Sequence, residues 1–406
     1  MDSRVETALR DLARREPDTA AAVRRAWDDL TAGSGDSRDV SQWWLQLSLW
    51  DQLARSSRGT AAEHARVAAT IGDLLAAVGL GRYAEIARSP RTREILLSTD
   101  DLARYAELYA AALRASGIQP PDTALIGWGP VMGPAEADAY ERAANALELA
   151  MISGDLVPGR RGAPSVRAAV TDAVLVAPQR DLAGQRPLHQ IAAERLVEWA
   201  DRSATLTGLV EPLTDELTSG VPEPLSGVAG SLEPLRRALV VVGGEAIEPG
   251  ATPEAIALAR RLGLVRLQSG DWALTGRGRR AAETPDALAA AVVAGWFGSR
   301  RTAETVAREV LSAALATHEV LDLEEVSALV RHVLEEDGWR VRGDAGDAAR
   351  AVSVDPLGEA LLLGLADPVP HGTSPEAAVR ARPRPELRPL VVAALRHHLL
   401  HHGLAP

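Results

Sequence analysis

The chain has 406 residues, of which 46% are hydrophobic, and carries a formal net charge of −11 at pH 7. This length allows about two to four domains with buried cores. The acidic balance argues against general coating of nucleic acid or of an anionic membrane surface, so any such binding must be local. The chain has no cysteine, which excludes disulfides, thiolate zinc sites and cysteine nucleophiles.

Lysine is also absent, since all 44 basic residues are arginine. This excludes lysine Schiff-base chemistry and a Walker-type phosphate loop. We attribute the bias to a GC-rich genome, because Phe and Asn are also scarce; escape from lysine-directed tagging is the alternative hypothesis. The amino terminus has no apolar signal segment, and no long uncharged apolar span follows it. We therefore expect a cytoplasmic, soluble protein with no membrane partner.

Residues 1–218 are predicted to form a multi-helical N-terminal domain. Two helical runs break near Pro17, and Ser41 caps a run that carries Trp43, Trp44 and Trp50. The helical spacing of these indoles favours a core seam over a ligand-stacking wall. Residues 40–117 have the short loops and apolar stripes of a helical bundle, and we expect the N-terminal helices to bind a protein partner or a ligand.

Residues 118–134 interrupt this helical pattern with prolines and glycines around Trp128 and Met132. A loop of this length often carries function, so it is a candidate partner or ligand surface; the alternative is a domain connector pinned by Trp128. Arg160 and Arg161 lie in a basic turn at 158–162 and are candidate anion contacts. An enzyme acting at this loop is a third interpretation.

Residues 219–231 (SGVPEPLSGVAGS) have the composition of a linker. We place the domain boundary there, with a central module at 232–300.

The central module begins with an apolar helix at 233–242. Thr252 is predicted to cap a second helix that has Pro253 at its first turn, and Gly263 is placed to end it. Residues 264–267 and 272–274 read as two antiparallel strands around a turn at 268–271, and Thr275 caps the next helix. This order over residues 252–280 resembles the closing half of a winged helix-turn-helix, as found in many bacterial regulators.

The resemblance implies that the helix before the wing enters the major groove of DNA, while the wing contacts phosphate or the minor groove. Residues 252–280 contain six arginines but only two acidic residues, Glu254 and Asp271. This local excess of positive charge suits contact with phosphate groups. The helix TPEAIALARRL offers no Asn, Gln, Ser or Lys in its middle to read a base edge, so we expect backbone contacts. The resemblance assigns DNA contact to Arg260, Arg261, Arg266, Gln268, Arg277, Arg279 and Arg280.

Residues 301–406 are predicted as a C-terminal helical region. Helices at 303–316 and 323–337, followed by Gly338 and a strand at 339–342, are compatible with a second winged-helix-like unit between 303 and about 367. An irregular connection follows at 367–389. The last predicted helix carries His397, His398, His401 and His402, whose i,i+4 pairs could chelate a metal; we favour a solvated helix end.

No hydrolase elbow, zinc-protease pair, Walker loop or dinucleotide fingerprint occurs in the sequence. We therefore predict a mainly α, non-enzymatic winged-helix protein that contacts DNA mainly through phosphates and has a regulatory role. We expect no cofactor and no metal. The alternative is a protein-interaction adaptor with a purely structural winged helix, and the sequence leaves the oligomeric state open.

Overall fold

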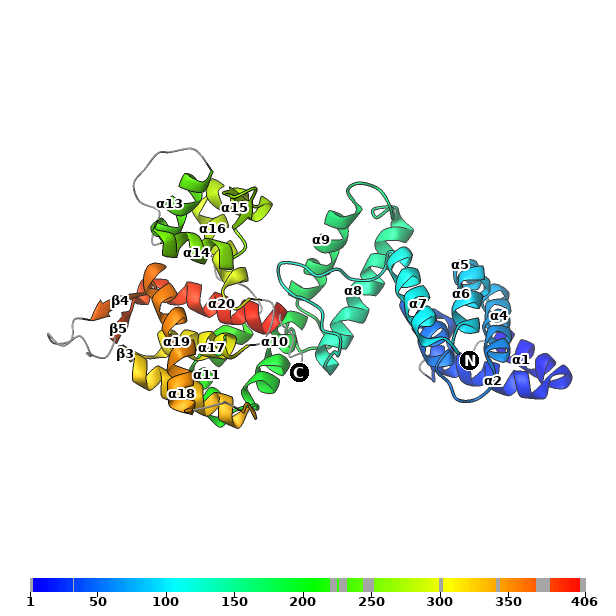
Figure 1. The fold of residues 1–406 in the computed structure, drawn as a ribbon. Helices are drawn as coiled ribbons and strands as arrows, with labels where there is room; N and C mark the ends of the chain where they lie inside the picture. The colour runs from blue at the N-terminus through cyan, green and yellow to red at the C-terminus, as the bar shows by residue number, and fades with distance from the viewer. Residues whose placement is uncertain are drawn as a thin grey trace. The chain divides into compact units, whose positions relative to one another are not determined.

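The computed structural model describes residues 3–31, 33–219, 225, 232–243, 252–298, 302–340, 344–369 and 380–401. This part of the chain is mainly helical, as predicted (Figure 1). It divides into two compact units, each discontinuous in sequence. Unit 1 contains Met1–Pro121 and Asp138–Val174, and unit 2 contains Asp122–Ala137 and Leu175–Pro406.

Unit 1 is a bundle of helices around a core that includes Trp27, Ile71 and Ile95, all fully buried. A π-helical turn, Ser48–Leu53, continues α3. The helices are α1 (Ser3–Arg15), α2 (Pro17–Leu30), α3 (Gln42–Leu47), α4 (Ala61–Ala77), α5 (Gly81–Arg88), α6 (Pro90–Leu97), α7 (Leu102–Ser116), α8 (Pro134–Ser153) and α9 (Ala163–Val176), of which the last two also extend into unit 2.

The predicted indole seam is confirmed for Trp50, which is 4% exposed and donates its Nε1–H to Thr92 Oγ1 at 2.8 Å. Trp44 packs against the same core, and its Nε1–H donates to Glu141 Oε1 at 2.6 Å. The two indoles therefore join helices that are far apart in sequence.

Unit 2 combines helices with two small sheets. In the first sheet, β1 (Val265–Gln268) pairs antiparallel with β2 (Asp271–Leu274); in the second, the order is β3 (Leu321–Asp322), β5 (Arg380–Pro383), β4 (Ala366–Val369), all antiparallel. The helices are α10 (Pro187–Ala200), α11 (Ala204–Val210), α12 (Thr214–Thr218), α13 (Glu233–Val242), α14 (Pro253–Arg261), α15 (Gly276–Glu283), α16 (Pro285–Gly295), α17 (Ala303–Thr317), α18 (Leu323–Glu336), α19 (Ala345–Leu362) and α20 (Arg388–His401).

The units do not divide at the boundary predicted from composition. Residues 122–137 and 175–218, expected in the N-terminal domain, belong to unit 2, where α10 packs against α12 and α20. Most of the predicted linker at 219–231 lies outside the described residues. Contacts between segments distant in sequence, such as those of α10 with α20, define this division, and local composition does not report them.

Two further expectations for the C-terminal region are corrected. Trp339 and Arg340 form no strand, and the rest of the strand predicted at 339–342 lies outside the described residues. The strands after α19 are instead β4 and β5, within the stretch expected to be irregular. Because β5 pairs with both β3 and β4, backbone N–H and C=O groups of this stretch find hydrogen-bond partners that the sequence alone does not reveal.

Candidate nucleic-acid interface

The segment from α13 to α15 forms the helices and strands that the sequence predicts, and side chains cap the starts of α14 and α15. Thr252 Oγ1 accepts from the Ala255 amide at 3.2 Å, and Thr275 Oγ1 accepts from the Gly278 amide at 2.9 Å. Gly263, with φ +69°, ends α14 in the left-handed conformation. Ser269 (φ 54°) and Gly270 (φ 94°) make the tight turn that joins β1 to β2.

Five of the predicted DNA-contact side chains are exposed. Arg266 donates to Gln268 Oε1 at 3.3 Å across the tip of β1, and Arg279 donates to the Leu274 carbonyl at 3.2 Å. The Arg260 guanidinium lies 5.9 Å from the centroid of the Trp272 ring, within range of a cation–π interaction. The exposed set is Arg260, Arg266, Gln268, Arg279 and Arg280.

Arg261 and Arg277 instead face into unit 2. Arg261 pairs with Glu359 of α19 and donates to the Trp296 carbonyl at 2.9 Å, and Arg277 donates to the Ala291 carbonyl of α16. Burial is the main cause that lowers the pKa of both guanidinium groups. These two residues therefore hold elements together, and they leave four arginines of the predicted set on the surface.

The exposed arginines lie on both sides of the hairpin. Arg266 pairs with Ala273, and the next pair along, Leu267 with Trp272, points to the opposite face. Since Arg260 lies over Trp272, it shares the face opposite to that of Arg266. The surface can therefore meet negative charge on either side of a protruding hairpin.

A hollow of about 630 Å³ lies beside this hairpin, between α14 and β2. Its wall is apolar except for the side chains of Arg260 and Arg261. The lining residues are Pro253, Ile256, Ala257, Arg260, Arg261 and Trp272.

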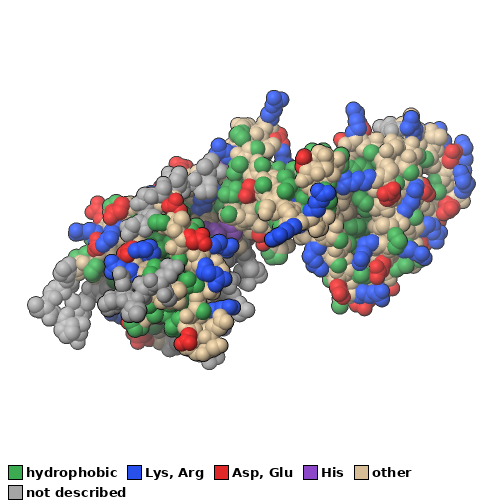
Figure 2. Space-filling model, turned by 90° about the horizontal axis from the view of Figure 1, so that it is seen from above, with side chains coloured by type: hydrophobic (Ala, Val, Ile, Leu, Met, Phe, Trp, Pro, Cys, Tyr) green, Lys and Arg blue, Asp and Glu red, His purple; other side chains and the backbone are tan. Residues whose placement is uncertain are grey.

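Cationic and acidic side chains are mixed on the face of the molecule that Figure 2 shows. In the view of Figure 2, arginine side chains are interspersed with acidic and apolar ones over both units. This agrees with the net charge of −11 and leaves no broad field of one sign on that face.

The residues of the other candidate surface, around Trp128, are divided between the two compact units. Trp128 and Met132 belong to unit 2 and are half-buried, whereas Arg160 and Arg161 belong to unit 1 and are exposed. The Gly127 amide donates to the Leu400 carbonyl at 2.9 Å, and the Trp128 amide donates to Asp122 at 3.0 Å. These hydrogen bonds attach the loop to α20 and join Trp128 to Asp122 within the loop.

Sequence reasoning missed the buried residue that fastens this loop. Arg195 Nη2 lies 2.7 Å from Glu136, and both side chains are nearly inaccessible, at 6% and 4% exposed. The same guanidinium donates to the Leu400 carbonyl at 2.6 Å and to the Gly127 carbonyl at 3.0 Å. No local pattern marks Arg195, because its partners lie far away in sequence.

The histidines of α20 do not form the solvated helix end that the sequence favoured. His398 is 9% exposed and lies 2.8 Å from Glu309, and its ring stacks on Phe297 at 4.3 Å. His401 is half-buried and stacks on His397 at 3.7 Å. His402 lies outside the described residues.

Among the residues that the structure describes, no group of three or more potential ligands could hold a metal ion. No described helix has the length and apolar character to cross a membrane.

Comparison with protein-family models, curated proteins and solved structures finds no match. Function is therefore inferred from the chemistry of the site itself.

Proposed function

We propose that this protein is a winged-helix protein that contacts DNA mainly through backbone phosphates, with a regulatory role. In this proposal α14 lies toward the major groove and the β1–β2 hairpin is the wing. The observation that carries it is the set of four exposed arginines around one hairpin, Arg260, Arg266, Arg279 and Arg280, in an acidic chain.

The exposed face of α14 favours phosphate contact over base reading. Its exposed side chains are Pro253, Glu254, Ala257 and Arg260. Direct readout of a base edge uses Asn, Gln, Arg or Lys in paired hydrogen bonds, and only Arg260 supplies such a group. The proposed contact is therefore largely independent of sequence.

A second winged-helix-like unit is part of the proposal. The order α17, β3, α18, α19, β4, β5, with β5 between β3 and β4, supports an assignment of this unit to 303–383, longer than the sequence suggested. Two arginines of this region are paired with acidic side chains: Arg380 of β5 with Asp322, and Arg384, just after β5, with Asp367. We therefore assign DNA contact to the first unit and a structural role to the second.

The alternative function is a protein-interaction adaptor, which the hollow beside Trp272 favours. Its apolar wall and its flanking guanidinium groups would suit an acidic or aromatic side chain of a protein partner. In this alternative the winged helix is structural and DNA is not a ligand.

The test measures fluorescence anisotropy of two labelled duplexes of unrelated sequence, titrated with the full chain at low salt. The wild type should bind both duplexes with similar affinity, and Arg279→Ala should weaken both alike, because a phosphate contact carries no sequence information. The matched control is Arg10→Ala, which removes one exposed arginine from α1. Absence of binding to either duplex would reject the DNA proposal and leave the adaptor.

A further inference from the structure

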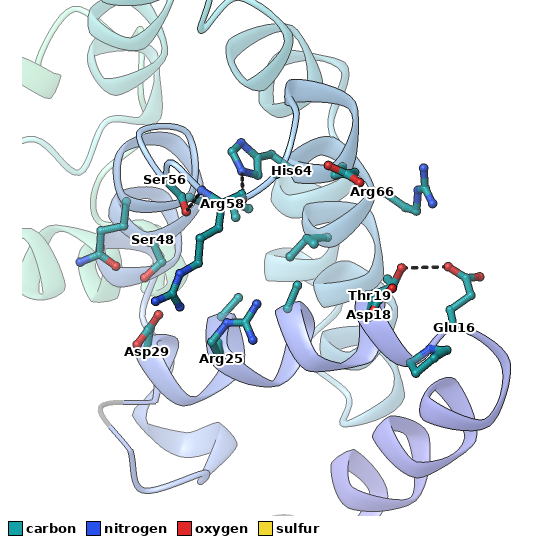
Figure 3. A pocket seen from close by; sticks show the side chains of 18 residues that line it. Glu16, Asp18, Thr19, Arg25, Asp29, Ser48, Ser56, Arg58, His64 and Arg66 are labelled. Atoms are coloured by element: carbon teal, nitrogen blue, oxygen red, sulfur yellow. Dashed lines mark hydrogen bonds between the residues drawn. The ribbon is translucent and has the colours of Figure 1, made fainter.

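Unit 1 contains an open cavity of about 590 Å³ between α2, the π-helical turn and the start of α4. Figure 3 shows that Arg25, from α2, and Arg58, from the loop before α4, extend into it from opposite walls. Apolar side chains, among them Ala22, Ala26 and Val67, also line the cavity. The cavity thus has two cationic groups over an apolar wall.

The loop that carries Arg58 is held firmly in place. His64, 4% exposed, lies with Nε2 2.8 Å from the Arg58 carbonyl; because a carbonyl only accepts, Nε2 carries the proton. The Arg58 amide donates to Ser56 Oγ at 3.2 Å, Gly59 has φ +97°, and Thr60 and Glu63 form a capping box. A buried histidine, a turn and a helix cap therefore all fix the backbone of one exposed arginine.

In the described part of unit 1, neither Arg58 nor Arg25 forms an ion pair or side-chain hydrogen bond. Ser48, on the cavity floor, is 6% exposed, and its Oγ has no hydrogen-bond partner. Rotation of this hydroxyl toward the cavity would therefore break no bond.

The charges at the two ends of the cavity select the kind of ligand. Asp29 lies at the same end as Arg25 and Arg58 (Figure 3), so this end has a formal charge of one positive unit. Glu16, Asp18 and Arg66 lie toward the other end (Figure 3), and Glu63 also lines the cavity; the excess of carboxylates over Arg66 disfavours a second negative charge there. A monoanion fits this distribution better than a dianion or a polyanion.

We propose that this cavity binds a small carboxylate with an apolar body. The carboxylate lies between Arg25 and Arg58, which match its geometry with paired N–H donors, and the apolar part lies along Ala22, Ala26 and Val67. His64 is a positioning residue that acts through the Arg58 backbone. The inference concerns unit 1 alone and does not depend on DNA contact by unit 2.

The test is isothermal titration calorimetry of the full chain with sodium benzoate, with benzyl alcohol as the neutral counterpart and inorganic phosphate as a second anion at matched ionic strength. Arg58→Gln and Arg25→Gln each remove one cationic group. Arg55→Gln is the matched control, since Arg55 is exposed in the same segment, pairs with Asp51 and does not line the cavity.

Benzoate should bind the wild type and Arg55→Gln equally, and at least about tenfold more weakly to Arg58→Gln and Arg25→Gln, as expected for loss of a charged hydrogen bond. Benzyl alcohol should bind far more weakly than benzoate to the wild type. No benzoate binding, equal binding by all variants, or a preference for phosphate would each overturn the proposal. Circular dichroism of the variants separates loss of the ligand contact from loss of the fold.

Discussion

At the scale of single residues, Arg195 illustrates how one buried cation organises unit 2. It joins α10 to the first turn of α8 through Glu136, to the preceding loop through Gly127, and to the end of α20 through the carbonyl of Leu400. The last carbonyls of a helix have no amide partner within that helix. Arg195 donates hydrogen bonds to these carbonyls at a position that is nearly inaccessible to solvent.

The first prediction concerns removal of this cation. Arg195→Leu should lower the free energy of unfolding by about 3–5 kcal/mol, because Glu136 is left as a buried, uncompensated charge. Arg380→Leu, which breaks the more exposed pair with Asp322, should cost about 1 kcal/mol or less. Urea denaturation of both variants measures the difference, and equal costs would show that burial does not dominate the Arg195 pair.

The second prediction concerns how the stability of the fold changes as the pH falls. Burial lowers the pKa of His401 below its ordinary value of 6.5, against the opposing effect of hydrogen bonds to the Thr123 and His397 carbonyls. The unfolded chain therefore binds a proton first as the pH falls through 6.5, and the stability that neutral His401 contributes is lost between that pH and its lower folded pKa.

His401→Gln should remove this contribution, so its free energy of unfolding should vary less than that of the wild type between about pH 7 and pH 5. Urea denaturation at several pH values measures both slopes. A variant slope as steep as that of the wild type would assign the acid sensitivity to other groups.

At the scale of elements, the backbone of Leu264, just before β1, lies so close to α15 that one position permits only glycine. A Cβ atom on Gly278 would be 1.9 Å from the carbonyl oxygen of Leu264, whereas a Cβ on Gly276 would meet nothing closer than 4.0 Å. Both glycines are in α15, so they form a matched pair of test positions.

The third prediction follows from this contrast. Gly278→Ala should destabilise unit 2 by at least about 3 kcal/mol, because the strand and α15 must separate. Gly276→Ala should be neutral or stabilise it by about 0.4–1 kcal/mol, through a less flexible unfolded chain. Thermal denaturation of the two variants measures both effects; a tolerated Gly278→Ala would contradict the close approach of β1 to α15.

The same module shows how far its sequence predicts its structure. Thr252, Gly263 and Thr275 act on backbone groups within a few residues of themselves, so their roles could be predicted from local pattern. The inward direction of Arg261 could not, because its partner Glu359 lies 98 residues away. Local chemistry thus predicts the elements, while the identity of the exposed arginines depends on tertiary contacts.

The cavity of unit 1 was not predicted either. Its arginines come from α2 and from the loop before α4, and only the packing of α2 against α4 brings them to one space. In the sequence, nothing distinguishes either arginine from an ordinary solvent-exposed charged residue. A cavity is a property of packing, and single-sequence periodicity reports only which face of each helix is buried.

At the scale of the whole molecule, the chain is acidic, and its proposed DNA contact is confined to one hairpin and its flanking helices. Four exposed arginines cannot offset a net charge of −11 over a long duplex. Binding should therefore be weak at physiological salt and should depend steeply on salt, since release of counterions supplies most of its free energy.

The most direct test of the DNA proposal is the slope of log affinity against log salt concentration, measured by fluorescence anisotropy with a labelled random duplex. Contact with up to four phosphates predicts a slope of about −3 to −4 for the wild type. The Arg266→Ala/Arg279→Ala double variant should bind more weakly, and the magnitude of its slope should be smaller by about 1–2. Arg10→Ala/Arg15→Ala, which removes the same charge from exposed positions of α1, should keep the wild-type slope. A flat wild-type signal at low salt, or equal losses in both double variants, would contradict a DNA interface at this hairpin.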